Sequence, residues 1–194
     1  MTPDFRRHLG YLPNLVSLGR IGLILVATVL LMTGWPLLGL IIGIIGGISD
    51  YLDGYLARKR GETTDLGALL DSLADILFSL VCLTVSVMYR IWPAYLLVAW
   101  GFRDMTIMTL RGSAGLQGFM IKSSFLAKLA WNFNAYAFVL MGLDIARPFS
   151  SEMITNGVHW LGLFGIHAGI LMQWISGGQY LASYAAQYRE KKPD

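Results

Sequence analysis

The sequence predicts an all-α polytopic membrane protein with six transmembrane helices, from its composition, its apolar runs and its charge distribution. Of the 194 residues, 55% are hydrophobic and 14% are charged, and the mean hydropathy is +0.56. Soluble domains carry about 25% charged residues, so this chain is too apolar for that class. A helix needs roughly 20 mostly apolar residues to cross a bilayer. Six runs are of that kind, at residues 15–33, 36–57, 66–88, 93–111, 124–143 and 154–186.

Each run ends at residues that interrupt a membrane helix. Proline marks the boundaries at 34–36, 92–93 and 147–151, with a glycine at the first of them. Short segments with polar residues at 59–64 and 112–123 mark the other two boundaries. The six spans occupy nearly the whole chain, which is therefore predicted to be a single domain, residues 1–194.

The N-terminal segment 1–13 precedes the first span. Its residues Arg6, Arg7 and His8 make it too polar for the apolar centre of a cleavable signal peptide. We expect this segment to lie along the membrane surface.

The basic residues are distributed unequally about the six predicted spans. Arg90 and Arg147 fall on one side, and Arg103 lies inside the fourth span. The other twelve of the 15 Lys and Arg fall on the opposite side: Arg6, Arg7, Arg20, Arg58, Lys59, Arg60, Arg111, Lys122, Lys128, Arg189, Lys191 and Lys192. The positive-inside tendency then places both termini in the cytoplasm. The net charge of +3 suits anionic lipid headgroups, and no nucleic-acid-binding module is visible.

Four aspartates lie close to the cytoplasmic ends of the second and third spans. An ionised carboxylate at membrane depth costs at least ~2.5 kcal/mol, so such a cluster indicates a functional site. Asp50 and Asp53 are three residues apart and Asp71 and Asp75 are four apart, so each pair lies on one face of its helix. The short segment 59–64 predicts antiparallel neighbouring helices, which bring the two pairs to similar depth.

Four neighbouring carboxylates repel one another unless cations neutralise them. Hard divalent ions such as Mg²⁺ and Mn²⁺ prefer oxygen ligands and commonly share them with phosphates. His8, His159 and His167 are far from the cluster in sequence, and no zinc-like spacing is present. A carboxylate-bound metal pair acting on phosphate oxygens is the simplest interpretation.

Small residues accompany the acids. Gly54, Ala57 and Gly67 remove bulk where a substrate could approach the backbone. Glycines in membrane helices often serve only helix packing, which is our interpretation of Gly39, Gly43 and Gly47. Arg58 supplies a cation at the surface where phosphates lie. It could instead be a positive-inside anchor, an interpretation that we prefer for Lys59 and Arg60, but its fixed spacing to the acids favours a role in the site.

The complete run is Asp50-x2-Asp53-Gly54-x2-Ala57-Arg58-x8-Gly67-x3-Asp71-x3-Asp75. It resembles the signature of the CDP-alcohol phosphatidyltransferases, with every specified position present. The resemblance implies a six-helix membrane enzyme that transfers a phosphatidyl or similar group from a CDP-linked lipid to an alcohol and releases CMP. It implies that the four aspartates hold two divalent ions and that Asp75 is the general base. It also implies that Gly54, Ala57, Arg58 and Gly67 line the CDP site together with Asp53 and Asp71.

The start of the first span extends this resemblance. Asn14, Ser17 and Arg20 are similar to the family pattern Asn-x2-Thr-x2-Arg, with serine in place of threonine. The resemblance implies that Asn14 and Ser17 reach the nucleotide or its phosphates. The alternative is that Asn14 caps the helix and Arg20 extends to the membrane surface.

Later segments resemble the phosphatidylglycerophosphate synthases within that family. Arg103-Asp104-x5-Leu110-Arg111 is similar to their Arg-Glu-x5-Leu-Arg segment, and Ser176-Gly177-x2-Tyr180 to their last-span motif. Lys128 stands where they carry Gly-Lys-x-Lys-Thr. The resemblance implies an acceptor pocket for glycerol 3-phosphate formed by Arg103, Arg111, Lys122 and Lys128.

The chain departs from those synthases at several positions. Ala130 and Trp131 replace a lysine and a threonine, and Ser72 and Ile76 replace their usual proline and lysine. The acceptor could therefore be inositol phosphate, inositol, serine or another alcohol. In that case Asn132 and Asn134 could hydrogen-bond a polyol.

Several of these charged residues also have a structural interpretation. Arg103 and Asp104 could form an ion pair, but adjacent helix residues do not face one another, so we expect separate partners. Lys122 and Lys128 could be positive-inside residues only. A transporter or proton relay would also explain intramembrane acids, but no internal repeat is visible.

We also predict that the protein lies in a bacterial inner membrane with its active site facing the cytoplasm, and that it forms a homodimer.

Overall fold

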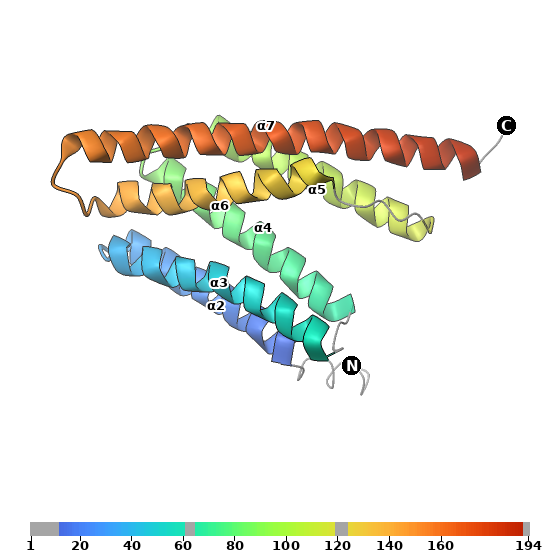
Figure 1. The fold of residues 1–194 in the computed structure, drawn as a ribbon, viewed down its shortest axis with the longest axis horizontal. Helices are drawn as coiled ribbons and strands as arrows, with labels where there is room; N and C mark the ends of the chain where they lie inside the picture. The colour runs from blue at the N-terminus through green and yellow to red at the C-terminus, as the bar shows by residue number, and fades with distance from the viewer. Residues whose placement is uncertain (1–11, 61–64, 119–123, 192–194) are drawn as a thin grey trace. The chain divides into compact units, whose positions relative to one another are not determined.

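The computed structural model describes residues 12–60, 65–118 and 124–191. All regular secondary structure in these residues is α-helical (Figure 1). The six helices are α2 (Leu12–Met32), α3 (Pro36–Arg60), α4 (Asp65–Met88), α5 (Tyr95–Leu116), α6 (Phe125–Ala146) and α7 (Glu152–Lys191). The all-α prediction is confirmed, and each predicted apolar run coincides with one helix. The N-terminal segment 1–13 lies outside the described residues, apart from its last two.

Four helices contain stretches that are long and apolar enough to cross a membrane. The stretches are Asn14–Met32, Leu69–Met88, Phe125–Ala146 and Glu152–Arg189. Helix α3 carries a shorter apolar stretch, Pro36–Ser49, which ends one residue before Asp50. Helix α5 contains Arg103, Asp104 and Arg111, whose charges reduce its mean hydropathy. The structure thus supports four of the six predicted spans by length and composition.

Local sequence explains several helix ends. Pro36 is the first residue of α3, where its missing N–H is not needed for a helical hydrogen bond. Arg147 follows α6 with a left-handed φ of 42°, and its N–H donates to the Leu143 carbonyl at 2.9 Å. A left-handed residue of this kind terminates a helix, and Pro148 then prevents its continuation.

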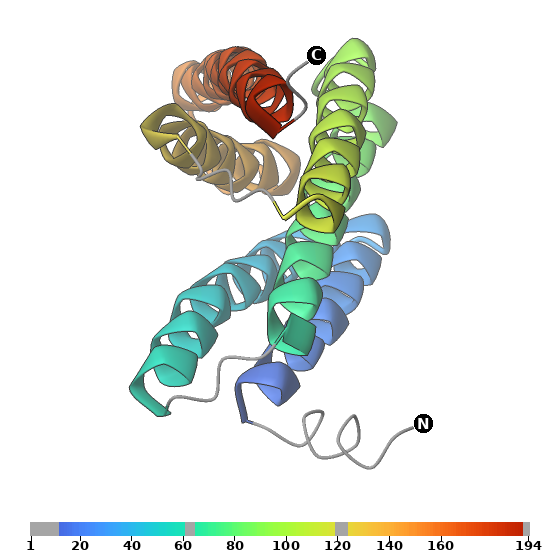
Figure 2. The same ribbon diagram turned by 90° about the vertical axis from the view of Figure 1, so that its right-hand side faces the viewer.

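The chain forms two compact units. Described residues of 12–89 and 142–150 form the first, and those of 90–141 and 151–191 form the second. In the first unit, α2 packs against both α3 and α4. Figures 1 and 2 show that the beginnings of α2 and α4 lie at the same end of this unit as the last turns of α3. In the second unit, α7 packs against α5.

Glycine allows α3 to approach α2 closely. A Cβ atom built on Gly39 would lie 2.8 Å from the Ala27 carbonyl oxygen and 2.9 Å from the Leu31 nitrogen. The packing interpretation of Gly39 is therefore confirmed. No described atom lies within 4 Å of a Cβ built on Gly43 or Gly47, so these two glycines make no such close contact with the described residues of the chain.

The close contact at Gly39 leads us to predict that a larger residue at this position destabilises the protein. Gly39→Ala should lower the free energy of unfolding by about 1–3 kcal/mol, because the new methyl group meets backbone atoms that cannot move independently. Thermal unfolding in detergent measures the effect. Gly22→Ala on α2, where no described atom lies within 4 Å of a built Cβ, is the matched control, and an equal loss of stability in both variants would contradict the packing argument.

Helices α6 and α7 pack against each other at three glycines of α7, which are Gly162, Gly165 and Gly169. Cβ atoms built on Gly162 and Gly165 would lie 3.3 Å from Leu140 Cβ and 3.4 Å from Ala137 Cβ. At Gly169 the neighbour is the side chain of Asn134, which is 1% exposed. As residue numbers rise along α7 the contacts descend along α6, so these helices are antiparallel. Small residues at spacings of three and four are typical of tight packing between membrane helices.

Candidate active site

A buried arginine joins the first and third helices of the first unit. The Arg20 Nη2 atom on α2 donates to Asp71 Oδ1 on α4 at 2.9 Å and to the Asp71 backbone carbonyl at 3.1 Å. The same nitrogen lies 3.5 Å from Asp75 Oδ1. The Arg20 side chain is 4% exposed, whereas those of Asp71 and Asp75 are 49% and 38% exposed. Arg20 therefore holds two carboxylates that remain accessible to a ligand.

The prediction that Asp71 and Asp75 share one face of their helix is confirmed, because both approach the same Arg20 nitrogen. Ala74, between them in sequence, is fully buried. Gly67 lies one turn before Asp71 on α4. The spacing of four residues thus places two hard oxygen ligands together, which is a donor set suited to a divalent cation such as Mg²⁺ or Mn²⁺.

Asn14, Ser17 and Arg20 are buried on one face of α2. Their exposed fractions are 1%, 4% and 4%. Asn14 is the third residue of α2, so it lies within the helix and is not its N-cap. The expectation that Arg20 extends to the membrane surface is also wrong, because the carboxylates of α4 give its guanidinium partners inside the protein.

The other predicted residues of this site lie in the last turns of α3. The backbone is helical through Arg60, which puts Asp50, Asp53, Gly54 and Ala57 on one face. The side chains of these residues and of Arg58 lie outside the described part of the structure. Among the described side chains there is no group of three or more His, Cys, Asp and Glu that could hold a metal ion. Of the four predicted metal ligands, the described side chains are those of Asp71 and Asp75.

Arg103 joins α5 to α7 in the second unit. Its Nε atom donates to the Gln173 backbone carbonyl at 3.2 Å, and its Nη1 atom donates to Asp104 Oδ1 at 2.8 Å. The expectation of separate partners for Arg103 and Asp104 is therefore wrong. The long arginine side chain can bend back to its neighbour although the two Cβ atoms point in different directions. Only 13% of the Arg103 side chain is exposed. Its hydrogen bond to Gln173 links α5 to α7, in addition to the acceptor role predicted for it.

This contact predicts a loss of stability in Arg103→Ala. The variant should lower the free energy of unfolding by about 1–3 kcal/mol, because the Asp104 carboxylate loses a charged hydrogen-bond donor. Thermal unfolding in detergent again measures the change. Arg189→Ala, at an exposed position of α7, is the control; a melting temperature of Arg103→Ala within error of this control would refute the link.

Of the two other described cations of the predicted acceptor pocket, Arg111 contacts the last-span motif on α7, and Lys128 lies on the helix whose first end contacts it. The Arg111 Cζ atom lies 5.8 Å from the centroid of the Tyr180 ring, within the range of a cation–π contact. Lys128 is exposed on the first turn of α6. Ser124, four residues before it, hydrogen-bonds Ser176 between Oγ atoms at 2.8 Å. The segment Ser176–Tyr180 is thus a common neighbour of both helix ends that carry these cations, while Lys122 lies outside the described residues.

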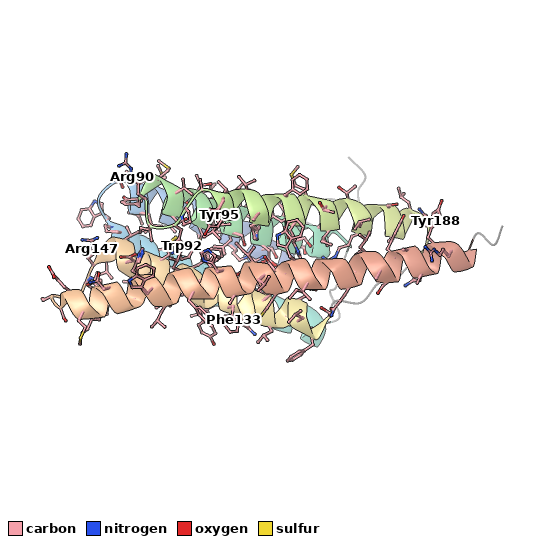
Figure 3. The ribbon with its side chains drawn as sticks, turned by 90° about the horizontal axis from the view of Figure 1, so that it is seen from above. Arg90, Trp92, Tyr95, Phe133, Arg147 and Tyr188 are labelled. Atoms are coloured by element: carbon pink, nitrogen blue, oxygen red, sulfur yellow. The ribbon has the colours of Figure 1, made fainter. Side chains whose placement is uncertain are left out.

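Sequence reasoning did not find the polar contacts that connect α5 to α7. Tyr95 lies beside α7 (Figure 3), and its hydroxyl is 2.6 Å from His167 Nε2. Further along, the hydroxyl groups of Ser113 and Tyr184 are 2.8 Å apart. Neither pair belongs to a recognisable motif. A four-residue periodicity of polar residues on α7 could have indicated a polar face, but not its partners.

The apolar helices and the aspartates of α4 indicate the class of protein, which is a helical membrane protein with an acidic site at one end of a helical unit. The model of the family described as CDP-alcohol phosphatidyltransferase matches residues 10–168. The chain belongs to this family of enzymes, which confirms the resemblance inferred from the aspartate run. The match includes every residue predicted for the metal and CDP sites.

Curated relatives bear two different names. A CDP-diacylglycerol–glycerol-3-phosphate 3-phosphatidyltransferase of Bacillus subtilis is 29% identical over 133 residues, which cover 61% of this chain and 69% of that protein. A cardiolipin synthase (CMP-forming) of Streptomyces coelicolor is 37% identical over 115 residues, 57% of this chain and 51% of that protein. A protein of Salmonella choleraesuis with the first name is 35% identical over 108 residues, 52% of this chain and 58% of that protein. The matched region thus spans between about half and two thirds of the length of these relatives.

Proposed function

We propose that this chain transfers the phosphatidyl group of CDP-diacylglycerol to a hydroxyl of glycerol 3-phosphate, giving phosphatidylglycerophosphate and CMP. The observation that carries the proposal is the placement of Asp71 and Asp75 on one face of α4, in contact with Arg20. These two aspartates complete a signature whose other positions precede them on α3 and α4. The chain's family and the names of two of its relatives support the donor and the acceptor.

The reaction needs one bond made, one bond broken and one proton moved. The acceptor oxygen bonds to the phosphorus that carries diacylglycerol, and the bond from that phosphorus to the oxygen of CMP breaks. Asp75 takes the proton of the acceptor hydroxyl, so CMP leaves as an anion. Its carboxylate is 38% exposed, which leaves it accessible to a hydroxyl, and a positioned base typically contributes about 10²–10⁴-fold in rate.

The acidic residues have a second role in this proposal. Two divalent ions, Mg²⁺ or Mn²⁺, held by Asp50, Asp53, Asp71 and Asp75, would neutralise charge on the diphosphate and on the leaving CMP. Asn14 and Ser17, buried on the same face of α2 as Arg20, would bind CDP. The remaining CDP-binding residues of this proposal are Asp53, Gly54, Ala57, Arg58, Gly67 and Asp71.

The acceptor pocket is assigned to the cations near Ser176–Tyr180. Arg111 and Lys128 are exposed and can bind the phosphate of the acceptor, while Lys122 would add a third positive charge. Arg103 would orient the pocket through its hydrogen bond to the Gln173 carbonyl. A pocket of this kind favours an acceptor that itself carries a phosphate.

The membrane arrangement belongs to the same proposal. Six spans, with α3 and α5 crossing as well, place both termini and the aspartate end of the first unit in the cytoplasm of a bacterial inner membrane. The open positions Gly43 and Gly47 lie one turn apart on α3, beside exposed isoleucines such as Ile44 and Ile48. Small residues at this spacing are typical of contacts between membrane helices, which supports a homodimer.

CMP release tests the proposal. Purified protein is given CDP-diacylglycerol, Mg²⁺ or Mn²⁺, and one acceptor at a time: glycerol 3-phosphate, inositol phosphate, inositol, serine or phosphatidylglycerol. We expect CMP release that depends on both metal and glycerol 3-phosphate. No acceptor-dependent release with either metal would refute the transferase. Release with phosphatidylglycerol only, or with another alcohol only, would keep the transferase and change the acceptor.

A further inference from the structure

We propose that Arg20 is a positioning residue, which holds Asp71 and Asp75 in the geometry that binds metal and accepts the proton. This inference rests on the proposed function of the two aspartates. It assigns a role to Arg20, which the sequence pattern places in the first span without a function in the site.

The contacts of Arg20 fix both side chain and backbone of α4. One nitrogen, Nη2, meets Asp71 Oδ1 at 2.9 Å, the Asp71 carbonyl at 3.1 Å and Asp75 Oδ1 at 3.5 Å. Bonding to a backbone carbonyl ties the guanidinium to one axial position of α4. The hydrogen bond to the Asp71 carboxylate and the ion pair with Asp75 then fix the orientation of the two carboxylates relative to that position.

Stability alone does not explain an arginine at this place. Arg20 lies on a buried face of α2, between the polar residues Asn14 and Ser17 on one side and the apolar residues Ile24, Ala27 and Leu31 on the other. Replacing a buried ion pair by well-packed apolar side chains is often neutral or stabilising. A charged residue on this face therefore indicates a requirement of the site.

The exposed fractions indicate what that requirement is. Arg20 is buried, while about half of the Asp71 side chain and more than a third of the Asp75 side chain stay open. The guanidinium thus approaches the carboxylates from the protein side and leaves their outer surface to ligands. Partners of this kind behind metal-binding groups typically contribute about 10–100-fold in metal affinity or activity.

Two effects of Arg20 must be separated experimentally. Its positive charge alone would weaken the binding of a second cation, whereas its geometry would strengthen that binding. Arg20→Lys keeps the charge and changes the geometry, because the lysine side chain is one bond shorter than the path to Nη2, the atom that makes all three contacts in Arg20. This variant therefore reports on positioning.

The test measures Mn²⁺ binding to the purified full-length protein by electron paramagnetic resonance, and separately the kcat of CMP release at saturating Mn²⁺. We expect Arg20→Lys to weaken Mn²⁺ binding about tenfold or more and to lower kcat, with an unchanged KM for the acceptor. Arg189→Lys, the same change at an exposed site of α7, should match the wild type. Thermal unfolding of both variants verifies that they are folded.

The outcomes distinguish this inference from the proposed function. Wild-type Mn²⁺ affinity and kcat in Arg20→Lys would overturn the positioning role. If Arg20→Lys is unfolded, Arg20→Met, which occupies the same face of α2, replaces it; tighter Mn²⁺ binding in that variant would show that Arg20 acts only as a competing charge. Weaker Mn²⁺ binding in a protein that releases no CMP with any alcohol would support the positioning role and refute the transferase.

Discussion

Asp75→Asn should reduce the kcat of CMP release by about 10²–10⁴-fold, which is the range expected for loss of a general base. Asparagine has nearly the same shape and keeps an oxygen that can accept from Arg20, which lies 3.5 Å from Asp75 Oδ1. It cannot accept the proton of the attacking hydroxyl at neutral pH. Initial rates of CMP release at saturating CDP-diacylglycerol, acceptor and metal measure the effect.

A comparison with Asp71→Asn separates the base from a metal ligand. Both aspartates contact the same arginine nitrogen and lie one turn apart on α4. Loss of a ligand weakens metal binding, so a higher concentration of Mn²⁺ should restore much of the rate of Asp71→Asn. The same addition should leave Asp75→Asn nearly inactive, because metal does not replace the base. Equal recovery of both variants would contradict a special role for Asp75.

Glu152→Gln is the matched control for both substitutions. Glu152 is exposed in the first turn of α7, so removing its charge should leave kcat and thermal stability unchanged. A decrease in kcat similar to that of Asp75→Asn would indicate that loss of any acidic side chain affects the assay.

The helices could be predicted from the sequence because a membrane helix is a local structure. The length of each apolar run and the proline or glycine beside it are both visible in the chain. The helix ends are harder to predict. Helix α7 continues to Lys191, whereas the apolar run at 154–186 predicts an end at residue 186. Residues after 186 include glutamine, glutamate and lysine, which favour a helix outside a membrane as well. Hydropathy alone therefore underestimates the helix length.

The site was predictable only where its residues are neighbours in sequence. The spacing of Asp71 and Asp75 determines their common face, and the structure confirms it. The contact between Arg20 and Asp71 joins residues 51 positions apart, so it depends on the packing of α2 against α4. The prediction that Arg103 and Asp104 have separate partners was wrong for a different reason: the general rule on helix faces describes Cβ directions, and a long arginine side chain is not limited by them.

Arg111→Ala and Lys128→Ala should each raise the KM for glycerol 3-phosphate about 10–100-fold and leave the KM for CDP-diacylglycerol nearly unchanged. A hydrogen bond to a charged group contributes about 1.5–3 kcal/mol, which corresponds to this range. Both side chains are exposed, so their removal should cost little stability. Initial rates with each substrate varied in turn, in detergent micelles of constant composition, measure the two KM values.

Tyr180 sharpens this test because it contacts Arg111 through its ring. Tyr180→Phe keeps the ring and should preserve the acceptor KM, whereas Tyr180→Leu removes the cation–π contact at 5.8 Å and should raise it. Arg189→Ala controls for the loss of a positive charge elsewhere on α7. Equal increases in both KM values would exclude Arg111 and Lys128 from the acceptor pocket. An increase confined to glycerol 3-phosphate would instead show that the phosphate of the acceptor is bound at the ends of α5 and α6, beside Ser176–Tyr180.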